Sequence, residues 1–308
     1  MPIYKINTNK LDPISEKKID LEKDIQSLTE QNLETVFGFE FIRSEFQMNS
    51  LRIDTLAWNK ESQSFIIIEY KKDRSFSVID QGYAYLALML NNKADFILEY
   101  NEKMKNNLKR DDVDWSQSRV IFVANSFTSY QQSAINFKDL PIELWEAKKY
   151  QNDLILYNQL KCPDSSESIK TISKNKTVNE VSNEVKNYTI DDHFKENWKE
   201  SRELFDQLNE KILSRYSEVR QTPVKTFIGY KIGQKNLICI WGLKSGPWIE
   251  FTRSQPKDFN DPDKRVKYNE NSMKHYNQHT SGFLVKNSDD VDYAMSLINQ
   301  SYNRMTRD

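Results

Sequence analysis

Apolar residues dominate two neighbouring segments early in the chain. Residues 51–58 and 64–71 both fit strands, and the polar turn NKESQ between them predicts an antiparallel hairpin. The second segment, SFIIIEYK, is apolar on both faces until its end, which is typical of a strand buried within a sheet. Because side chains alternate along a strand, Glu69 and Lys71 point to one face at that end. Asp54 interrupts the apolar pattern of the first segment, so we expect two carboxylates and one lysine to meet at one sheet end.

Segments with the helical spacing of apolar residues lie before and after this hairpin in the sequence. Residues 14–37 carry apolar positions at i, i+4 and i+7 and stop at Gly38, which predicts a helix. SVIDQGYAYLALML predicts a second helix, and Ser77 and Asp80 have the spacing of a capping box. RVIFVA then predicts a buried strand, SYQQSAINF a helix, and IELWEAKKYQNDLILYNQL two closing strands. The order α-β-β-α-β-α-β-β predicts an α/β domain with a mixed sheet of about four or five strands flanked by helices.

The composition changes after residue 161. Residues 162–187 are rich in Ser, Asn, Lys and Glu and contain no aromatic residue, which predicts a flexible linker between a domain at 1–161 and one at 188–308. In the second domain, helical patterns lie on either side of three strand candidates, KTFIGYKI, NLICIWGL and PWIEFTR, which predicts a smaller α+β domain. Four of its aromatic residues could stack on bases or another ligand, although such residues more often belong to a core. They are Tyr230, Trp241, Trp248 and Phe251.

The overall composition indicates a cytoplasmic protein without membrane contact. The chain has 308 residues, of which 38% are hydrophobic and 29% charged, as expected for a soluble protein of about two domains. No apolar stretch approaches the roughly 20 residues that cross a bilayer, and the first residues lack the hydrophobic region of a signal peptide. Cys162 and Cys239 are too few for a disulfide framework or a thiolate metal site.

The charge balance does not exclude nucleic acid as a partner. The formal net charge is -1, with 20 basic and 24 acidic side chains in residues 1–160 and 24 basic and 21 acidic ones in residues 161–308. A mildly acidic half can still bind phosphates when its carboxylates hold a divalent cation. A chain with only 7 glycines and no glycine-rich phosphate loop is not expected to have a nucleotide-binding P-loop or Rossmann turn, so no NTPase is implied. His275 and His279 have helical zinc-pair spacing, but the intervening YNQ lacks a catalytic glutamate, so we expect no zinc site.

The residues at the end of the hairpin suit phosphodiester hydrolysis. Mg²⁺ prefers hard oxygen ligands, so Asp54 and Glu69 together with a substrate phosphate make a suitable site. Lys71 beside them would orient or activate the attacking water.

Asp54, followed fifteen residues later by Glu69-Tyr70-Lys71, resembles the motif of the PD-(D/E)XK nuclease superfamily. Ile53 stands where the superfamily name has proline. LEKDIQSLTEQNLETVFG is similar to the first helix of bacterial branches of the superfamily, which places their acidic residue on Glu22. SVIDQGYAYL resembles the helix after the catalytic strand and places the family's glutamine on Gln81. The resemblance covers roughly residues 14–160.

The resemblance implies a restriction-endonuclease-like fold and a DNA nuclease that depends on Mg²⁺ or Mn²⁺, of a kind used in repair, restriction or defence. It implies DNA as the partner and leaves a homodimer open. The catalytic residues that it implies are Asp54, Glu69, Lys71, Glu22 and Gln81, and its metal ligands are Asp54, Glu69 and Glu22. The second domain is similar to an uncharacterised C-terminal domain labelled predicted transport protein, although no membrane segment supports that label.

Simpler interpretations stand beside these. The chain could be a catalytically inactive nuclease-like module that binds nucleic acid or a protein partner, but an intact Asp54, Glu69 and Lys71 set favours an enzyme. Glu69 and Lys71 could form only a solvated ion pair, worth at most about 1 kcal/mol. Glu22 could lie on a solvated helix face, and Gln81 could only cap or pack. For Lys72 and Arg74, a solvated strand exit is favoured over phosphate contacts.

Overall fold

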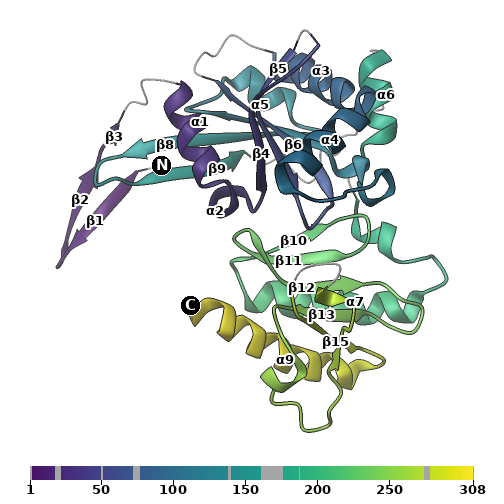
Figure 1. The fold of residues 1–308 in the computed structure, drawn as a ribbon. Coiled ribbons are helices and arrows are strands. Elements are labelled where there is room, and N and C mark those ends of the chain that lie inside the picture. Colours follow the sequence, from purple (N-terminus) through teal and green to yellow (C-terminus); the bar gives the residue numbers. More distant parts are fainter. Residues whose placement is uncertain are drawn as a thin grey trace. The chain divides into compact units, whose positions relative to one another are not determined.

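The computed structural model describes residues 2–17, 22–49, 51–71, 77–137, 140–160, 176–186, 188–273 and 278–307. The chain forms two compact units, Met1–Asn187 and Tyr188–Asp308, and each is described by itself. The first unit is a mixed α/β fold and the second is α+β, so the expected fold class is confirmed (Figure 1).

The first unit begins with strands and continues with alternating helices and strands. Its elements are β1 (Ile3–Asn7), β2 (Lys10–Ile14), β3 (Glu16–Lys17), α1 (Glu22–Gln31), α2 (Leu33–Phe37), β4 (Glu40–Met48), β5 (Leu51–Asn59), β6 (Ser64–Lys71), α3 (Val78–Asn91), α4 (Lys93–Met104), β7 (Arg119–Ala124), α5 (Ser129–Ala134), β8 (Ile142–Tyr150), β9 (Ile155–Leu160) and α6 (Lys176–Glu184). Two short 3-10 helices, Arg110–Asp112 and Trp115–Gln117, lie between α4 and β7.

Seven strands form the main sheet of this unit, which is more than the four or five expected. The order is β3-β8-β7-β6-β5-β4, with β9 paired to β8, while β1 and β2 form a separate two-stranded sheet. The β6–β7 and β7–β8 pairs are parallel, whereas the β4–β5 and β5–β6 pairs are antiparallel. β6 is buried along its whole length except at Lys71, because its apolar run lets both faces contact a core.

Helices cover both faces of the sheet. On one face, an apolar cluster joins the sheet to α3, α4 and α6 and includes Phe65, Ile67 and Phe122. On the other face, a second cluster joins Ile66, Ile68 and neighbouring strand residues to α1 and α2. The alternation along β6 therefore distributes its side chains between two cores, as expected from its sequence.

Several local predictions are confirmed, and others need correction. Ser77 caps α3 by accepting a hydrogen bond from the backbone N–H of Asp80, and Gly38 ends α2 with a left-handed φ of 73°. The predicted helix over 14–37 begins too early, since α1 starts at Glu22 after the short strand β3. β4 and α4 were not predicted, because the charged residues of β4 interrupt its alternation and α4 follows α3 after only Asn92.

The predicted linker over 162–187 is corrected within its described part. Residues 176–184 form α6, which packs against α3 through a cluster that includes Val178, Val181 and Val185. These valines have helical i, i+3 and i+7 spacing, so a segment of polar composition still presents one apolar stripe. Residues 162–175 and 187 lie outside the described residues.

The second unit is an antiparallel sheet covered by two long helices. Its elements are α7 (Lys199–Arg215), β10 (Val219–Pro223), β11 (Ile228–Ile232), β12 (Lys235–Trp241), β13 (Trp248–Thr252), β14 (Lys267–Tyr268), β15 (Thr280–Leu284), α9 (Ser288–Arg307) and two short 3-10 helices, Ile190–His193 and Pro256–Asp258. The strand order is β10-β11-β12-β13-β15-β14, and α7 and α9 contribute to its main core. Among the described residues of both units, no helix combines the length and apolar character needed to cross a membrane.

Candidate active site

The candidate site begins where the ladder between β5 and β6 ends. The paired positions run from Asn59–Ser64 to Thr55–Ile68, and Asp54 and Glu69 come next on the two strands. At this point side-chain carboxylates, and not backbone carbonyls, accept the hydrogen bonds of the backbone N–H groups. The backbone N–H of Asp54 donates to Glu69 Oε1 at 3.0 Å, and the backbone N–H of Tyr70 donates to Asp54 Oδ2 at 3.0 Å. This reciprocal exchange holds both carboxylates at the same end of the sheet.

Lys71 completes the group from the end of β6. Its Nζ lies 3.2 Å from Glu69 Oε2, so both oxygens of Glu69 have a partner on neighbouring backbone or side chain. The side chain of Glu69 is 1% exposed, whereas that of Lys71 is 21% exposed. The lysine ammonium therefore lies at the solvent boundary with the glutamate behind it.

Burial makes the carboxylate pair unfavourable to ionise. Burial raises the pKa of Glu69 to about 7, and the negative charge of Asp54 is the next contribution. Burial likewise raises the pKa of Asp54, and Glu45 adds to that rise, while the Tyr70 N–H and Lys71 oppose it. A divalent cation between two such carboxylates would relieve both the poor solvation and the mutual repulsion.

The strand beside Asp54 is distorted on its other side as well. The paired positions of β4 and β5 include Ser44–Thr55 and Phe46–Ile53, and Glu45 between them has a φ of 53°. A non-glycine residue in the left-handed region costs about 1 to 2 kcal/mol and is frequently found at functional sites. The chain is thus irregular on both sides of the proposed metal ligand.

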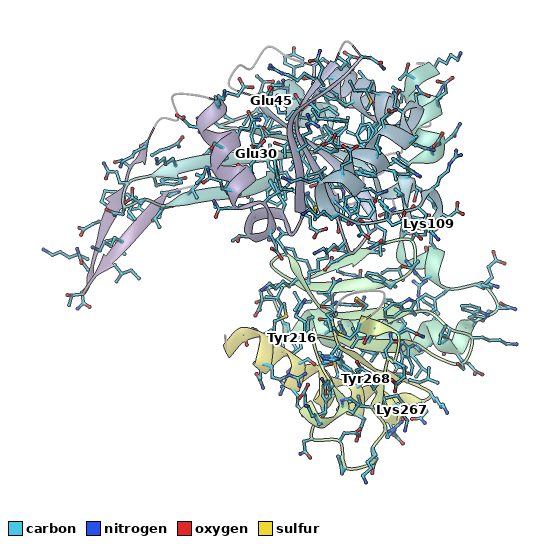
Figure 2. The ribbon with its side chains drawn as sticks, in the orientation of Figure 1. Glu30, Glu45, Lys109, Tyr216, Lys267 and Tyr268 are labelled. Atoms are coloured by element: carbon cyan, nitrogen blue, oxygen red, sulfur yellow. The ribbon has the colours of Figure 1, made fainter. Side chains whose placement is uncertain are left out.

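Gln26, a residue that the sequence analysis did not select, contacts Asp54 from α1. Its Nε2 donates to the backbone carbonyl of Asp54 at 3.1 Å and also lies 3.1 Å from Glu30 Oε1. Glu45 Oε1 is 3.4 Å from the same nitrogen, so Glu30 of α1 and Glu45 of β4, both labelled in Figure 2, approach one amide group. The buried amide therefore satisfies the carbonyl of Asp54 where the ladder is irregular.

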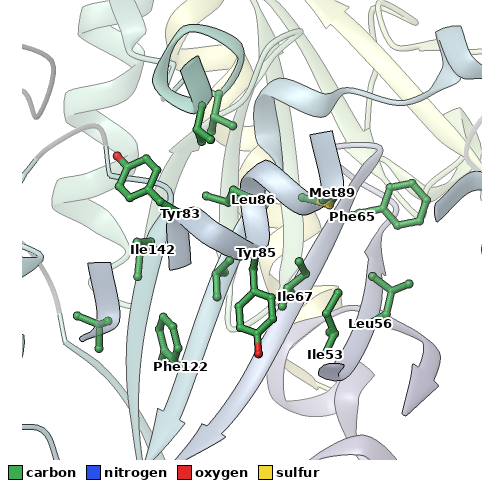
Figure 3. Close-up of a cluster of buried hydrophobic side chains, with 14 of the residues drawn as sticks. Ile53, Leu56, Phe65, Ile67, Tyr83, Tyr85, Leu86, Met89, Phe122 and Ile142 are labelled. Carbon is green, nitrogen blue, oxygen red and sulfur yellow. The ribbon is translucent and has the colours of Figure 1, made fainter. Parts of the chain in front are cut away.

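Tyr85, also not selected from the sequence, approaches the pair from α3. Its hydroxyl donates to the backbone carbonyl of Arg52 at 3.0 Å and accepts from Gln81 Nε2 at 3.4 Å. Burial raises the pKa of Tyr85, and the carboxylate of Glu69 is the next cause, which places the hydroxyl beside that carboxylate. In Figure 3 this hydroxyl points away from Leu86 and Met89 in the apolar cluster. Gln81 thus reaches the group through Tyr85.

Glu22 does not join Asp54 and Glu69 in a single cluster. It is exposed at the first position of α1, one turn before Gln26. Within the described ranges, no group of three or more His, Cys, Asp or Glu side chains could hold a metal ion. The structure therefore brings together two of the three expected ligands, and Lys72 and Arg74 lie outside the described residues.

The remaining sequence candidates lie in the second unit. Tyr230 and Phe251 are fully buried in the core under α7 and α9, so the core interpretation holds for these two. Trp241 and Trp248 are half-buried, and Trp241 packs beside Cys239 in a separate small cluster. His279 Nδ1 lies 2.7 Å from the hydroxyl of Tyr268, and His275 lies outside the described residues.

Comparison with known proteins gives the family. Residues 190–304 match the model of a domain of unknown function, DUF5655. An uncharacterised protein of Haemophilus influenzae is 40% identical over 311 residues, covering 98% of this chain and 99% of that protein. This chain belongs to the same family. The DUF5655 match lies within the second unit and assigns it no transport role.

Two solved structures are similar to part of the chain. The structure of the EndoMS-dsDNA2 complex has 15% identity, covers 44% of this chain and 50% of that chain, and gives a TM-score of 0.28. The crystal structure of a repair endonuclease from Pyrococcus abyssi has 16% identity, covers 43% of this chain and 50% of that chain, and gives a TM-score of 0.24. The chain thus spans half the length of each.

Proposed function

We propose that the first unit is a nuclease that uses Mg²⁺ or Mn²⁺ to hydrolyse phosphodiester bonds of DNA. The observation that carries this proposal is the reciprocal arrangement of Asp54 and Glu69 at the end of the β5–β6 ladder, with Lys71 on Glu69. A buried glutamate and a half-buried aspartate, both with raised pKa values, together with an adjacent lysine, are costly in a fold that needs no cation there. Asp54, Glu69 and Lys71 take the catalytic roles in this proposal.

The donor set fits Mg²⁺. This ion keeps several waters and is usually held by one or two carboxylates together with substrate phosphates, so two protein ligands are sufficient. Asp54 and Glu69 would hold it, and Glu22 is a ligand in this proposal only if its side chain moves from its exposed position. When bound, such an ion stabilises negative charge on the scissile phosphate and lowers the pKa of bound water.

The remaining residues hold this group in place or move protons. Lys71 Nζ lies at the solvent boundary beside Glu69, where its positive charge can steady the attacking water or the charge that develops on the phosphate. Gln26 fixes the backbone of Asp54, and Tyr85 closes the α3 side of Glu69 while Gln81 orients its hydroxyl. Gln26, Tyr85 and Gln81 are positioning residues in this scheme.

The second unit has a separate role in this proposal. We assign residues 188–308 to a binding domain whose half-buried Trp241 and Trp248 contact a ligand or nucleic acid. The association of two copies of the chain stays a prediction.

The test is a cleavage assay on the full chain. Single-stranded, duplex and branched DNA are incubated with Mg²⁺, Mn²⁺ or a chelator, and we expect cleavage only with a metal. Asp54→Asn should abolish it, whereas Asp95→Asn, the same change at an exposed position of α4, should not. DNA binding without metal-dependent cleavage by the unchanged chain would instead favour an inactive binding module.

A further inference from the structure

A second Glu-x-Lys pair lies on the same sheet as the first. β6 ends with Glu69-Tyr70-Lys71, and β8 carries Glu146-Ala147-Lys148 near its carboxyl end. Lys148 Nζ lies 3.1 Å from Glu146 Oε2, close to the 3.2 Å that separates Lys71 from Glu69. The two lysine side chains are 22% and 21% exposed, so each is mostly covered but reaches solvent.

The sheet register places both pairs on one face and at one edge. Lys71 is paired with Ala124 of β7, and Ala124 is paired with Glu146 of β8. Paired residues of adjacent strands point to the same face, so Glu146 and Lys148 project on the side of Lys71. These three strands are parallel, and the carboxyl ends of such strands form the edge at which ligands bind in open α/β sheets.

The surroundings of the second pair differ from those of the first. Glu69 lies opposite another acidic residue, Asp54, whereas the positions paired with Glu146 are Ala124 and Asn158. The second pair therefore lacks the two-carboxylate arrangement that suits a divalent cation. What it offers is a lysine whose position is fixed by its own glutamate and which keeps two N–H donors for an anion.

We propose that Lys148, oriented by Glu146, binds a backbone phosphate of the nucleic acid that the Asp54 and Glu69 site cleaves. The inference rests on the proposed function and adds a contact to it. Two strand spacings separate Lys71 from Glu146, which is about 10 Å. At this distance from the Asp54 and Glu69 site, Lys148 contacts a phosphate other than the cleaved one.

Lys149 provides a matched control. It follows Lys148 directly and is exposed, and because side chains alternate along β8 it points to the opposite face of the sheet. Lys148→Gln and Lys149→Gln remove the same charge from the chain. A difference between their DNA affinities therefore depends on which face of the sheet carries the lysine and not on the net charge.

The experiment measures binding without cleavage. A labelled mixed-sequence DNA duplex is titrated with the full chain in a chelator over a series of salt concentrations. Lys148→Gln should weaken binding by about tenfold at 0.1 M salt and reduce the slope of log affinity against log salt by about one, because one phosphate contact is lost. Lys148→Arg should restore the slope, and Lys149→Gln should leave affinity and slope near those of the unchanged chain.

The outcomes separate this inference from the proposed function. Equal effects of Lys148→Gln and Lys149→Gln, or an unchanged slope in a chain that cleaves DNA, would overturn the phosphate contact and leave the nuclease proposal standing. A chain that never cleaves but binds DNA with the Lys148-dependent slope would support the contact and reject hydrolysis. Absence of any DNA binding would reject both.

Discussion

The two units each bury a glutamate within a sheet, and the two glutamates have different partners. Glu69 in β6 lies beside a second carboxylate and accepts from Lys71 and a backbone N–H. Glu250 in β13 is also buried, and burial raises its pKa, but its side-chain hydrogen bond comes from a neutral group, Asn269 Nδ2, at 3.4 Å from Glu250 Oε2. Neutral donors suffice for a structural glutamate, since they satisfy its oxygens without adding charge.

The comparison shows that burial raises the pKa of a glutamate in both units. What distinguishes the first unit is a second acid that raises the cost of ionisation, together with a lysine at the solvent boundary. Such groups with opposed preferences are typical of catalytic sites. The differences between the two glutamates can be tested by changing each in turn.

The largest expected effect is loss of cleavage when a proposed metal ligand is neutralised. Asp54→Asn and Glu69→Gln should each lower the cleavage rate by about 10⁴ or more, because several kcal/mol of charge stabilisation are lost with the cation. Cleavage rates and Mg²⁺ or Mn²⁺ affinity are measured together. Glu250→Gln should leave the rate unchanged, and a Glu250→Gln loss equal to that of Glu69→Gln would erase the distinction between the units.

A smaller loss of rate is expected for Lys71→Met. Metal affinity should stay nearly unchanged while the rate falls by about 10² to 10⁴, the range for a positioned proton-transfer or charge-stabilising group. Single-turnover cleavage at saturating metal, with metal affinity measured separately, tests this split. If Lys71→Met, Asp54→Asn and Glu69→Gln all kept the full rate of a cleaving chain, these residues would not form the active site. They would then be only solvated charges at the strand end.

The sequence predicted the parts of this site that lie on the β5–β6 hairpin. The apolar run of β6 fixes its place in the sheet, and alternation then fixes the face of Glu69 and Lys71. Gln26 and Tyr85 could not be identified in this way, because their roles depend on how α1 and α3 are rotated against the sheet. Tyr85 does stand four residues after Gln81, and this helical spacing is a signal that could have identified it.

The fold, too, was predicted only in part from the sequence. β4 was missed because Arg43 and Glu45 interrupt its apolar alternation, and Glu45 turns out to occupy the left-handed conformation. α6 was taken for linker because its composition is polar, although three valines at helical spacing lie against α3. Composition averages over faces, and only the periodicity of these few apolar residues reports that one face is buried.

A third prediction concerns pH in the metal-free chain. The pKa of Glu69 is about 7 in the folded state and about 4.5 for an ordinary glutamate, so the folded state binds more protons between these values. The free energy of unfolding should therefore fall as pH rises from about 4.5 to about 7 and then level off. Glu69→Gln should reduce this fall, to which the raised pKa values of Asp54 and Glu250 also contribute, and should stabilise the chain at pH 8 by on the order of 2 kcal/mol.

Mg²⁺ sharpens the comparison between the two glutamates. Glu250→Gln should also stabilise the metal-free chain at high pH, because the pKa of Glu250 is raised by burial as well. Saturating Mg²⁺ should remove most of the Glu69 contribution, since a cation favours the ionised form, and should leave that of Glu250 as it was. Chemical denaturation across pH, with and without Mg²⁺, measures both contributions to the free energy of unfolding. If Mg²⁺ changed only the contribution of Glu250, the assignment of Glu69 as a metal ligand would be contradicted.

The smallest expected effect tests whether α6 belongs to the first unit. Val181 is buried in the cluster that joins α6 to α3, so Val181→Ala removes two buried methyl groups and should cost about 1 to 2 kcal/mol of unfolding free energy. Asn179→Ala, on the exposed side of the same helix, should cost little. Hydrogen exchange measured peptide by peptide should quicken in α6 and α3 for Val181→Ala and stay unchanged in α7 and α9, because the latter pair belongs to the core of the second unit. Faster exchange in α7 and α9 as well would mean that the two units unfold together, and no change in α3 would mean that α6 adds nothing to the stability of the first unit.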